Sequence, residues 1–322
     1  MAGVNSITPA GRRLQEGAMG DRLTEARAYR IAGPALISFS GGRTSAYMLH
    51  EILRAHDGNL PSDVVVAFAN TGKEREETLR FVHECSTRWG VRVHWLEWRD
   101  GKPGYDEVGF NSASRSGEPF AALIAKKGYL PNAVTRFCTQ ELKVRVMRDF
   151  CRSLGWTRWE NVIGLRYDEG HRVLKALARN DTGKEPFKAV MPLAKAKATK
   201  RGHVLPFWAA QPFDLGLQDH EGNCDMCMLK SRGALKRLIR DNPDMPAWWK
   251  EQEQVVTSLR ATATGARFVT EYSYADLERE VRAQPFMPGL LDEEEYDVEC
   301  GLHCEPDAGR AALAQEGGRS DG

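Results

Sequence analysis

The residues best suited to chemistry form a short loop rich in serine and glycine, with the sequence S-F-S-G-G-R-T-S-A-Y over residues 38–47. Gly41 and Gly42 let the backbone turn sharply and approach an anion closely. The amides of such a turn, and those of a helix that follows it, can donate to phosphate oxygens. We therefore predict a phosphate-binding loop rather than a plain tight turn before a helix. Its residues are Ser38, Ser40, Gly41, Gly42, Arg43, Thr44 and Ser45.

The second reactive group is a pair of cysteines in the sequence N-C-D-M-C-M-L-K, where Cys224 and Cys227 form a C-x-x-C motif ahead of a basic helix. Two thiolates at this spacing can chelate one metal ion or one iron of a cluster. The separation of this pair from Cys138 resembles that of the cluster cysteines in iron–sulfur adenylylsulfate reductases, which implies that Cys138 is a third ligand. Three cysteines suit a 4Fe–4S cluster that keeps one iron open, which is our prediction. Zinc is the alternative, although a closed structural zinc site takes four protein ligands. A redox-active dithiol is a further alternative.

Two other cysteines, Cys85 and Cys151, fall on the apolar stripes of expected helices. Cysteines in such positions usually fill the core, so we predict a structural role for both. The aromatic faces of tryptophan can stack on an adenine or a nucleic-acid base, and the candidates are Trp208, Trp248 and Trp249. Core packing is the commoner use of tryptophan, and it is the one we expect here.

The elements that must position these residues alternate between strand and helix. Apolar, β-branched runs predict strands over residues 35–40, 63–70, 91–97 and 161–165. Helical spacing predicts helices over residues 44–55, 74–89, 140–154, 231–240 and 246–260. This alternation is typical of an α/β fold with a doubly wound, mainly parallel sheet and helices on both faces. Ligands bind such sheets beyond the carboxyl ends of the strands, where the glycine loop is expected.

Several segments, in the same order, resemble the phosphoadenosine phosphosulfate (PAPS) reductase family, a branch of the PP-loop, adenine nucleotide alpha hydrolase-like fold. The S-G-G-x-x-S sequence at 40–45 is similar to the pyrophosphate-binding PP-loop, and N-T-G-K-E at 70–74 is similar to the D-T-G-x-E turn of the family. The sequence C-T-Q-E-L-K at 138–143 resembles the family's Cys-x-x-x-x-Lys segment. The sequence G-L-R-Y-D-E-G-H-R at 164–172 resembles its G-x-R-x-x-E-x-x-R motif. The resemblance covers about residues 34–235, and Asn70 replaces the acid of the family turn.

This resemblance implies a site for ATP or for a sulfonucleotide, either PAPS or adenylylsulfate. Beside the glycine loop, it places in that site Asn70, Thr71, Gly72, Lys143 and Gly164. It also implies that Arg166 and Arg172 hold a phosphate or sulfate group, for which the guanidinium fork is well shaped. Surface ion pairs are the alternative role of the two arginines.

Near the end of the chain, the sequence E-C-G-L-H-C-E at 299–305 is similar to the E-C-G-L-H tail motif of the sulfonucleotide reductases. In that family the cysteine attacks the sulfonyl sulfur, which implies that Cys300 is the nucleophile and His303 its neighbour. The acidic run at 292–295 would raise the pKa of a nearby thiol and so disfavours this role. The alternative that Cys300 or Cys304 is the fourth ligand of the metal site therefore stays open.

Composition sets the surroundings in which these groups act. The chain has 322 residues, of which 42% are hydrophobic and 28% charged, as in ordinary globular proteins. It has no apolar run long enough to span a bilayer and no secretion signal at its N-terminus, so we expect a cytoplasmic location and no membrane partner. Residues 126–201 hold 18 Lys or Arg against 7 Asp or Glu, a balance that suits a polyphosphate, a sulfonucleotide or nucleic acid.

We expect a flexible lead-in over residues 1–30, a nucleotide-binding domain over 31–235 and a helical extension with an acidic tail over 236–322. Two functions fit this organisation. In the one we favour, ATP activates a target and the cluster delivers sulfur to it, with nucleic acid as a candidate acceptor. In the other, the enzyme reduces PAPS or adenylylsulfate to sulfite, with thioredoxin or another thiol as electron donor. A non-catalytic nucleotide-binding module has no specific support in the sequence.

Overall fold

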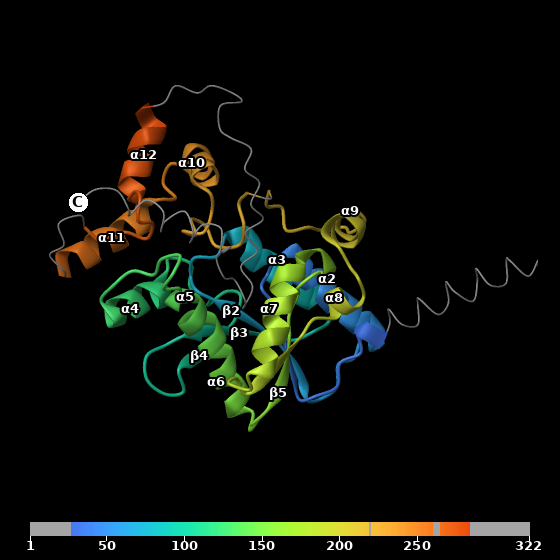
Figure 1. Cartoon of the computed structure of the whole chain (residues 1–322). Coiled ribbons are helices and arrows are strands. Elements are labelled where there is room, and N and C mark those ends of the chain that lie inside the picture. The colour runs from blue at the N-terminus through green and yellow to red at the C-terminus, as the bar shows by residue number, and fades with distance from the viewer. Residues whose placement is uncertain (1–26, 219, 260–264, 284–322) are drawn as a thin grey trace, which may run out of the picture. The chain divides into compact units, whose positions relative to one another are not determined.

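The computed structural model describes residues 27–218, 220–259 and 265–283 (Figure 1). Within these ranges the chain divides into two compact units that alternate along the sequence. Unit 1 contains residues 27–39, 43–65 and 158–214. Unit 2 contains residues 40–42, 66–157 and the described part of 215–283. The domain boundaries expected at residues 30 and 235 stay predictions.

Six strands form a mainly parallel sheet in the order β4-β3-β2-β1-β5-β6. The strands are β1 (Ala35–Ser38), β2 (Val64–Asn70), β3 (Val93–Trp98), β4 (Tyr105–Val108), β5 (Trp159–Val162) and β6 (Phe187–Val190). Strand β5 is parallel to both β1 and β6, and β3 is parallel to β2. Among the described strands, β4 alone runs antiparallel, against β3. The predicted α/β fold with a mainly parallel sheet is confirmed.

In unit 1, β1 is buried along its whole length and leads through the glycine loop into helix α2 (Arg43–Ala55). The predicted apolar face of α2, with Tyr47, Met48, Ile52 and Leu53, is buried. After β5 come a 3-10 turn (Tyr167–Glu169) and α7 (Gly170–Asp181). After β6 come α8 (Pro192–Lys195), a π-helical segment (Lys200–Val204) and α9 (Leu205–Ala209). These elements carry residues 43–45 of the loop and both arginines of the candidate nucleotide site.

Unit 2 has β3 and β4, the larger part of β2, and helices that carry Cys85, Cys138 and Cys151. Its first helices are α3 (Glu76–Arg88), α4 (Glu118–Lys127) and α5 (Phe137–Thr139). A π-helical segment (Gln140–Arg145) extends α5 into α6 (Val146–Ser153). The C-terminal helices α10 (Arg232–Asp241), α11 (Ala247–Leu259) and α12 (Tyr274–Ala283) pack through α12, which contacts both of the others (Figure 1).

The structure departs from the predicted elements at several places. No element was predicted over residues 183–208, but the structure has β6, α8 and α9 there, whose four or five residues are too few to show a periodic pattern. The helix expected at 140–154 begins at Phe137 and passes through a π-helical segment, so its side-chain spacing departs from 3.6 residues. The sequence pattern also missed β4, α4, α7 and α12. The helix expected from residue 74 begins at Glu76, because Glu74 closes the preceding turn.

The core explains the two cysteines that were expected to be structural. Cys85 and Cys151 are fully buried among apolar side chains, which confirms that expectation. Burial raises the pKa of the Cys151 thiol to about 12 and that of Cys85 well above its ordinary value, so neither is a ready thiolate. None of the helices in the described ranges combines the length and apolar character that crossing a bilayer requires.

A buried carboxyl group joins α11 to the segment that leads into α12. Glu253, on α11, accepts hydrogen bonds from the backbone amides of Phe268, at 3.3 Å, and Tyr274, at 2.9 Å. Burial raises the pKa of Glu253 to about 7, and these two hydrogen bonds only partly oppose the rise. The carboxyl group therefore binds its proton more tightly in the folded protein than in the unfolded chain.

This shift predicts a pH-dependent stability. Between about pH 4.5 and 7 the folded state binds more protons than the unfolded state, so stability falls as the pH rises. Glu253→Gln removes this titration. The free energy of unfolding of the variant, relative to wild type, should therefore rise by roughly 3 kcal/mol across that window. Denaturant titrations at pH 4.5 and 8 measure the change, with the exposed Glu251→Gln on the same helix as control. An equal change in both variants would contradict the assignment.

Candidate functional site

The glycine loop has the conformation that a phosphate-binding turn needs. Gly41 has φ +78°, and a Cβ added there would lie 2.7 Å from Cγ2 of Thr78. The position therefore excludes any side chain, both by backbone conformation and by space. The amide of Asn223 donates to the carbonyl oxygen of Ser40 at 2.9 Å, which anchors the loop. A Cβ at Gly42 would lie 3.3 Å from Nδ2 of the same asparagine.

The position of the loop in the sheet also matches a ligand site. Strands β1 and β5 are neighbours, yet the chain continues from β1 to β2 and β3 on one side and reaches β5 and β6 on the other. Open α/β sheets bind ligands at the carboxyl ends of the strands that flank such a reversal. The glycine loop follows β1, and Gly164 follows β5. A Cβ at Gly164 would lie 3.2 Å from Cα of Ser45, a tight contact that favours glycine at this position.

Unit 1 holds the predicted arginines in a network with carboxylates. The side chain of Arg166 is only 6% exposed, and its Nη1 donates to Oγ1 of Thr44 at 3.0 Å. Its Nε donates to Asp168 at 3.0 Å, and its backbone amide donates to Glu169 at 2.9 Å. Arg172 forms an ion pair with the same Glu169. Burial by itself raises the pKa of Asp168, but the hydrogen bond from the Lys200 amide and the charge of Arg166 lower it by more. The net pKa lies below its ordinary value, so this carboxylate stays charged.

The other predicted residues of the loop have protein partners as well. The hydroxyl of Ser38 donates to Oδ1 of Asn161 at 2.6 Å, which links β1 to β5. Arg43 forms a two-point ion pair with Asp214, and its carbonyl oxygen accepts from Nε1 of Trp208 at 2.9 Å. These contacts assign Ser38 and Arg43 structural partners, and phosphate binding by either residue stays a prediction.

Unit 2 brings together the predicted turn after β2 and Lys143. The amide and hydroxyl of Thr71 both donate to Oε2 of Glu74 at 2.8 Å, and the amide of Gly72 donates to Asn70 at 3.1 Å. Nζ of Lys143 lies 3.5 Å from Oε1 of Glu74, whose side chain is 1% exposed. Sequence reasoning assigned no role to Glu74, which holds this turn closed. Its position at the end of the N-T-G-K-E motif was the available signal.

The C-x-x-C turn is attached to the same turn after β2. Cys224 pairs with Glu74 through the backbone, and the Asp225 amide donates to the Lys73 carbonyl at 2.9 Å. The side chains of Lys73 and Asp225 form an ion pair at 2.8 Å, in which both are largely buried. The cysteine pair thus has a fixed position relative to a segment that the family resemblance places in the nucleotide site.

Two aromatic residues of the C-terminal helices hold the C-x-x-C turn from the other side. Nε1 of Trp249 donates to Asp225 at 2.9 Å, and the hydroxyl of Tyr274 donates to the carbonyl oxygen of Met226. Both side chains are fully buried, which confirms the expected core role of Trp249. Burial and the neighbouring Cys227 raise the pKa of Tyr274, so its hydroxyl remains a donor. No local pattern linked these residues to the cysteines, because they follow Cys227 by 22 and 47 positions.

The predicted metal site is tested only in part by these contacts. Cys138 and Cys224 are half-buried and Cys227 is buried, and all three belong to unit 2. Within residues 27–218, 220–259 and 265–283, no three His, Cys, Asp or Glu side chains are arranged to hold one metal ion. Shared ligation by the three cysteines therefore stays a prediction. The predicted nucleophile Cys300, with His303 and Cys304, lies outside the described residues.

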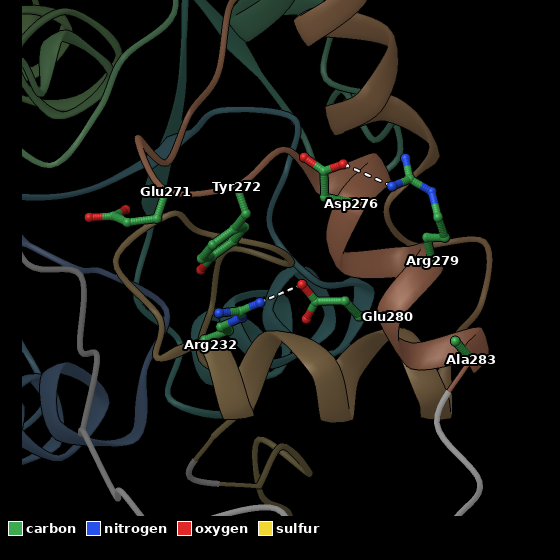
Figure 2. Close-up of a pocket in the computed structure, with 7 residues that line it drawn as sticks. All are labelled: Arg232, Glu271, Tyr272, Asp276, Arg279, Glu280 and Ala283. Carbon is green, nitrogen blue, oxygen red and sulfur yellow. Dashed lines mark hydrogen bonds and ion pairs between the residues drawn. The ribbon is translucent and has the colours of Figure 1, made fainter. Parts of the chain in front are cut away.

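An open pocket of about 360 Å³ lies elsewhere in unit 2, among residues of α10, α12 and the segment before α12 (Figure 2). Its lining residues are Arg232, Glu271, Tyr272, Asp276, Arg279, Glu280 and Ala283. Arg232 pairs with Glu280, and Arg279 pairs with Asp276 at 3.2 Å. Because both arginines are paired with carboxylates and no predicted site residue lines the pocket, we do not assign it to the nucleotide or cysteine chemistry.

Comparison with known proteins supports the nucleotide-binding interpretation. The family model of the phosphoadenosine phosphosulfate reductase domain matches residues 34–203. An uncharacterized nin region protein of Escherichia phage lambda is 28% identical over 225 residues, which are 67% of this chain and 73% of that protein. An uncharacterized protein of Methanocaldococcus jannaschii is 24% identical over 233 residues, which are 70% of this chain and 42% of that protein.

A solved structure is also similar, at a lower level. It is the U34-tRNA thiolase NcsA from Methanococcus maripaludis with its 4Fe–4S cluster. The match has a TM-score of 0.39 and 12% sequence identity, and it covers 83% of this chain and 87% of that one.

The contact between Tyr274 and Met226 predicts control of cysteine accessibility. Tyr274→Phe removes one hydrogen bond to the C-x-x-C turn, worth about 1 kcal/mol, so Cys224 and Cys227 should react with a thiol reagent about fivefold faster. Peptide mapping after timed alkylation measures each cysteine separately. Tyr105→Phe, which removes the hydrogen bond to Ser153 beside β4, is the matched control. Equal rates in wild type and Tyr274→Phe would show that the hydroxyl does not restrain the turn.

Proposed function

Because the chain belongs to the phosphoadenosine phosphosulfate reductase domain family, we propose that it is a PP-loop enzyme that binds ATP and transfers sulfur by means of its cysteines. The observation that carries this proposal is the glycine loop after β1, with its left-handed Gly41, at the reversal of strand order. Backbone amides in such a loop can bind the pyrophosphate of a nucleotide. The complete S-G-G-x-x-S sequence favours ATP over a sulfonucleotide.

In the proposed reaction, an oxygen of the acceptor attacks the α-phosphorus of ATP and pyrophosphate leaves. A sulfur nucleophile then displaces the adenylate from the activated acceptor. The loop residues Ser40–Ser45 would orient the phosphates, and Arg166 and Arg172 would stabilise their developing charge. In the described state these arginines pair with Asp168 and Glu169. A bound phosphate would therefore compete with these carboxylates for the two guanidinium groups.

The cysteines would supply the sulfur chemistry. Their soft thiolate donors suit iron–sulfur ligation better than ligation of a hard cation. When bound, a 4Fe–4S cluster with an open iron would hold a sulfur atom for transfer. The C-x-x-C turn and the turn of Asn70–Glu74 are joined through Glu74 and Lys73. We propose that this connection holds the cysteine pair beside the turn that the family resemblance assigns to the nucleotide site. The basic segment at 126–201 would favour a nucleic-acid acceptor.

A reductase that releases sulfite from PAPS or adenylylsulfate is the second candidate. The E-C-G-L-H sequence at 299–303 favours it, because it is similar to the tail that carries the attacking cysteine of such enzymes. In this function Cys300 would attack the sulfonyl sulfur, and thioredoxin or another thiol would resolve the product. Both functions use the same fold and an adenine nucleotide, and they differ in the group that reacts.

The loop assignment predicts a local loss of ATP binding in Gly41→Ala. The added methyl group meets Thr78, and alanine disfavours the positive φ of this position, so the loop backbone must shift from the conformation that we propose binds phosphate. We expect the ATP affinity to fall at least tenfold and pyrophosphate release to be lost. Gly58→Ala is the matched control, since it has φ +83° but open space around its Cβ. Both variants bear a similar backbone strain of about 1–2 kcal/mol. Equal ATP affinity in the two folded variants would contradict the loop assignment.

Cys300→Ser separates the two candidate functions. In an ATP-dependent sulfur-transfer enzyme the variant should still release pyrophosphate, while the product yield or the iron content falls. In a reductase it should bind the sulfonucleotide and lose all sulfite formation, because the thiolate is the attacking group. Anaerobic assays with ATP, PAPS and adenylylsulfate, together with iron and zinc determination, measure these outcomes. Sulfite formation by wild type without ATP turnover would overturn the favoured function.

A further inference from the structure

A buried arginine in unit 2 lacks the counter-ion that its charge requires. Arg136 is 8% exposed and immediately precedes α5. Its Nε and Nη1 are buried and have no hydrogen-bond partner among the described residues. Nη2 makes one long hydrogen bond, of 3.4 Å, to the hydroxyl of Thr139. A guanidinium group carries its charge at every physiological pH, so this side chain is a buried cation with two free donor positions.

The carboxylates on the neighbouring elements already have other partners. Glu141, on the same continuous helix, binds Lys127 at 2.8 Å and Arg145 at 2.9 Å. Glu74 accepts from Thr71 and faces Lys143. No carboxylate in residues 27–218, 220–259 and 265–283 forms an ion pair with Arg136. Native proteins rarely leave a buried guanidinium in this state, because an unpaired buried charge is strongly destabilising.

The backbone holds this arginine in place. Its carbonyl oxygen accepts hydrogen bonds from the amides of Thr139, at 3.1 Å, and Gln140, at 3.3 Å. Before it, the side chain of Asn132 accepts from the amides of Val134 and Thr135 and closes a turn. The backbone from which the Arg136 side chain extends is therefore constrained.

We propose that Arg136 is the recognition group of a binding site for a tetrahedral oxyanion, a phosphate or a sulfate group. A guanidinium group binds two oxygens of such a group side-on through Nε and Nη2, or end-on through Nη1 and Nη2, and each edge of Arg136 has one unoccupied nitrogen. The long bond from Nη2 to Thr139 is the contact that the oxyanion would replace. Arg136 precedes Cys138 by two residues, so the oxyanion binds near a thiol that is predicted to take part in the chemistry. The residues of the site belong to unit 2, and the proposal holds whether or not the nucleotide of the protein is ATP.

The proposal is tested by anion titration of Arg136→Met, a neutral variant of similar length. Removing an uncompensated charge should leave the anion-free protein at least as stable as wild type. In wild type, sodium sulfate or sodium phosphate should raise the thermal midpoint by about 2–4 °C near tenfold saturation, relative to sodium chloride at equal ionic strength. Arg136→Met should lose this rise, and Arg136→Lys should bind the anion at least tenfold more weakly. The control Arg145→Met, on the same helix, should keep it.

Two further arms identify the origin of the anion and separate this site from the glycine loop. A fall in ATP affinity in Arg136→Met would assign the bound group to the nucleotide, whereas unchanged ATP affinity with loss of the sulfate response would assign it to a separate ion. Gly41→Ala should keep the sulfate response, even where the proposed ATP function fails. A response that is lost in Gly41→Ala and kept in Arg136→Met would overturn the proposal. Destabilisation of the anion-free protein by Arg136→Met would also overturn it, since it would show that the chain itself neutralises Arg136.

Discussion

The carboxylate of Glu74 is the interaction on which the organisation of unit 2 depends. One of its oxygens accepts from both the amide and the hydroxyl of Thr71, and the other faces the ammonium group of Lys143. A carboxylate with almost no exposure must receive such donors, because burying it unpaired would cost several kcal/mol. Its backbone also pairs with Cys224. A single residue therefore closes the turn after β2, places the lysine and positions the first cysteine of the C-x-x-C motif.

The ion pair between Lys73 and Asp225 extends this connection. A largely buried ion pair contributes little net stability, because desolvation offsets most of the attraction, but breaking one costs about 3–5 kcal/mol. Asp225 also accepts from Trp249, so its position depends on helix α11 as well as on the turn after β2. Specificity explains such an arrangement better than stability does. Hydrogen bonds and ion pairs are directional, so they restrict the C-x-x-C turn to one position, whereas an apolar contact would allow several.

The features that the sequence predicted well are those that depend on neighbouring residues. Strand β1, the glycine loop and α2 were predicted together, because an apolar run, two glycines and helical spacing follow one another within 21 residues. The burial of Cys85 and Cys151 followed from helical periodicity. The contacts of Trp249 and Tyr274 with the C-x-x-C turn could not be predicted, because they join residues that are distant in sequence and have no recurring spacing. Strand β6 was missed because four residues cannot establish a period.

The arginines of the two units differ in how far their charge is already satisfied, and this difference bears on their roles. In unit 1, Arg166 and Arg172 pair with Asp168 and Glu169, so these guanidinium groups are neutralised before any ligand binds. A ligand phosphate must compete with these carboxylates, so the net gain from each contact is small and the position of the phosphate is decided largely by geometry. In unit 2, Arg136 has no such competitor among the described residues. An oxyanion at Arg136 would therefore gain nearly the full strength of a charge-assisted hydrogen bond. Arg136 would then contribute mainly to the affinity for the anion, whereas Arg166 and Arg172 would contribute mainly to its position.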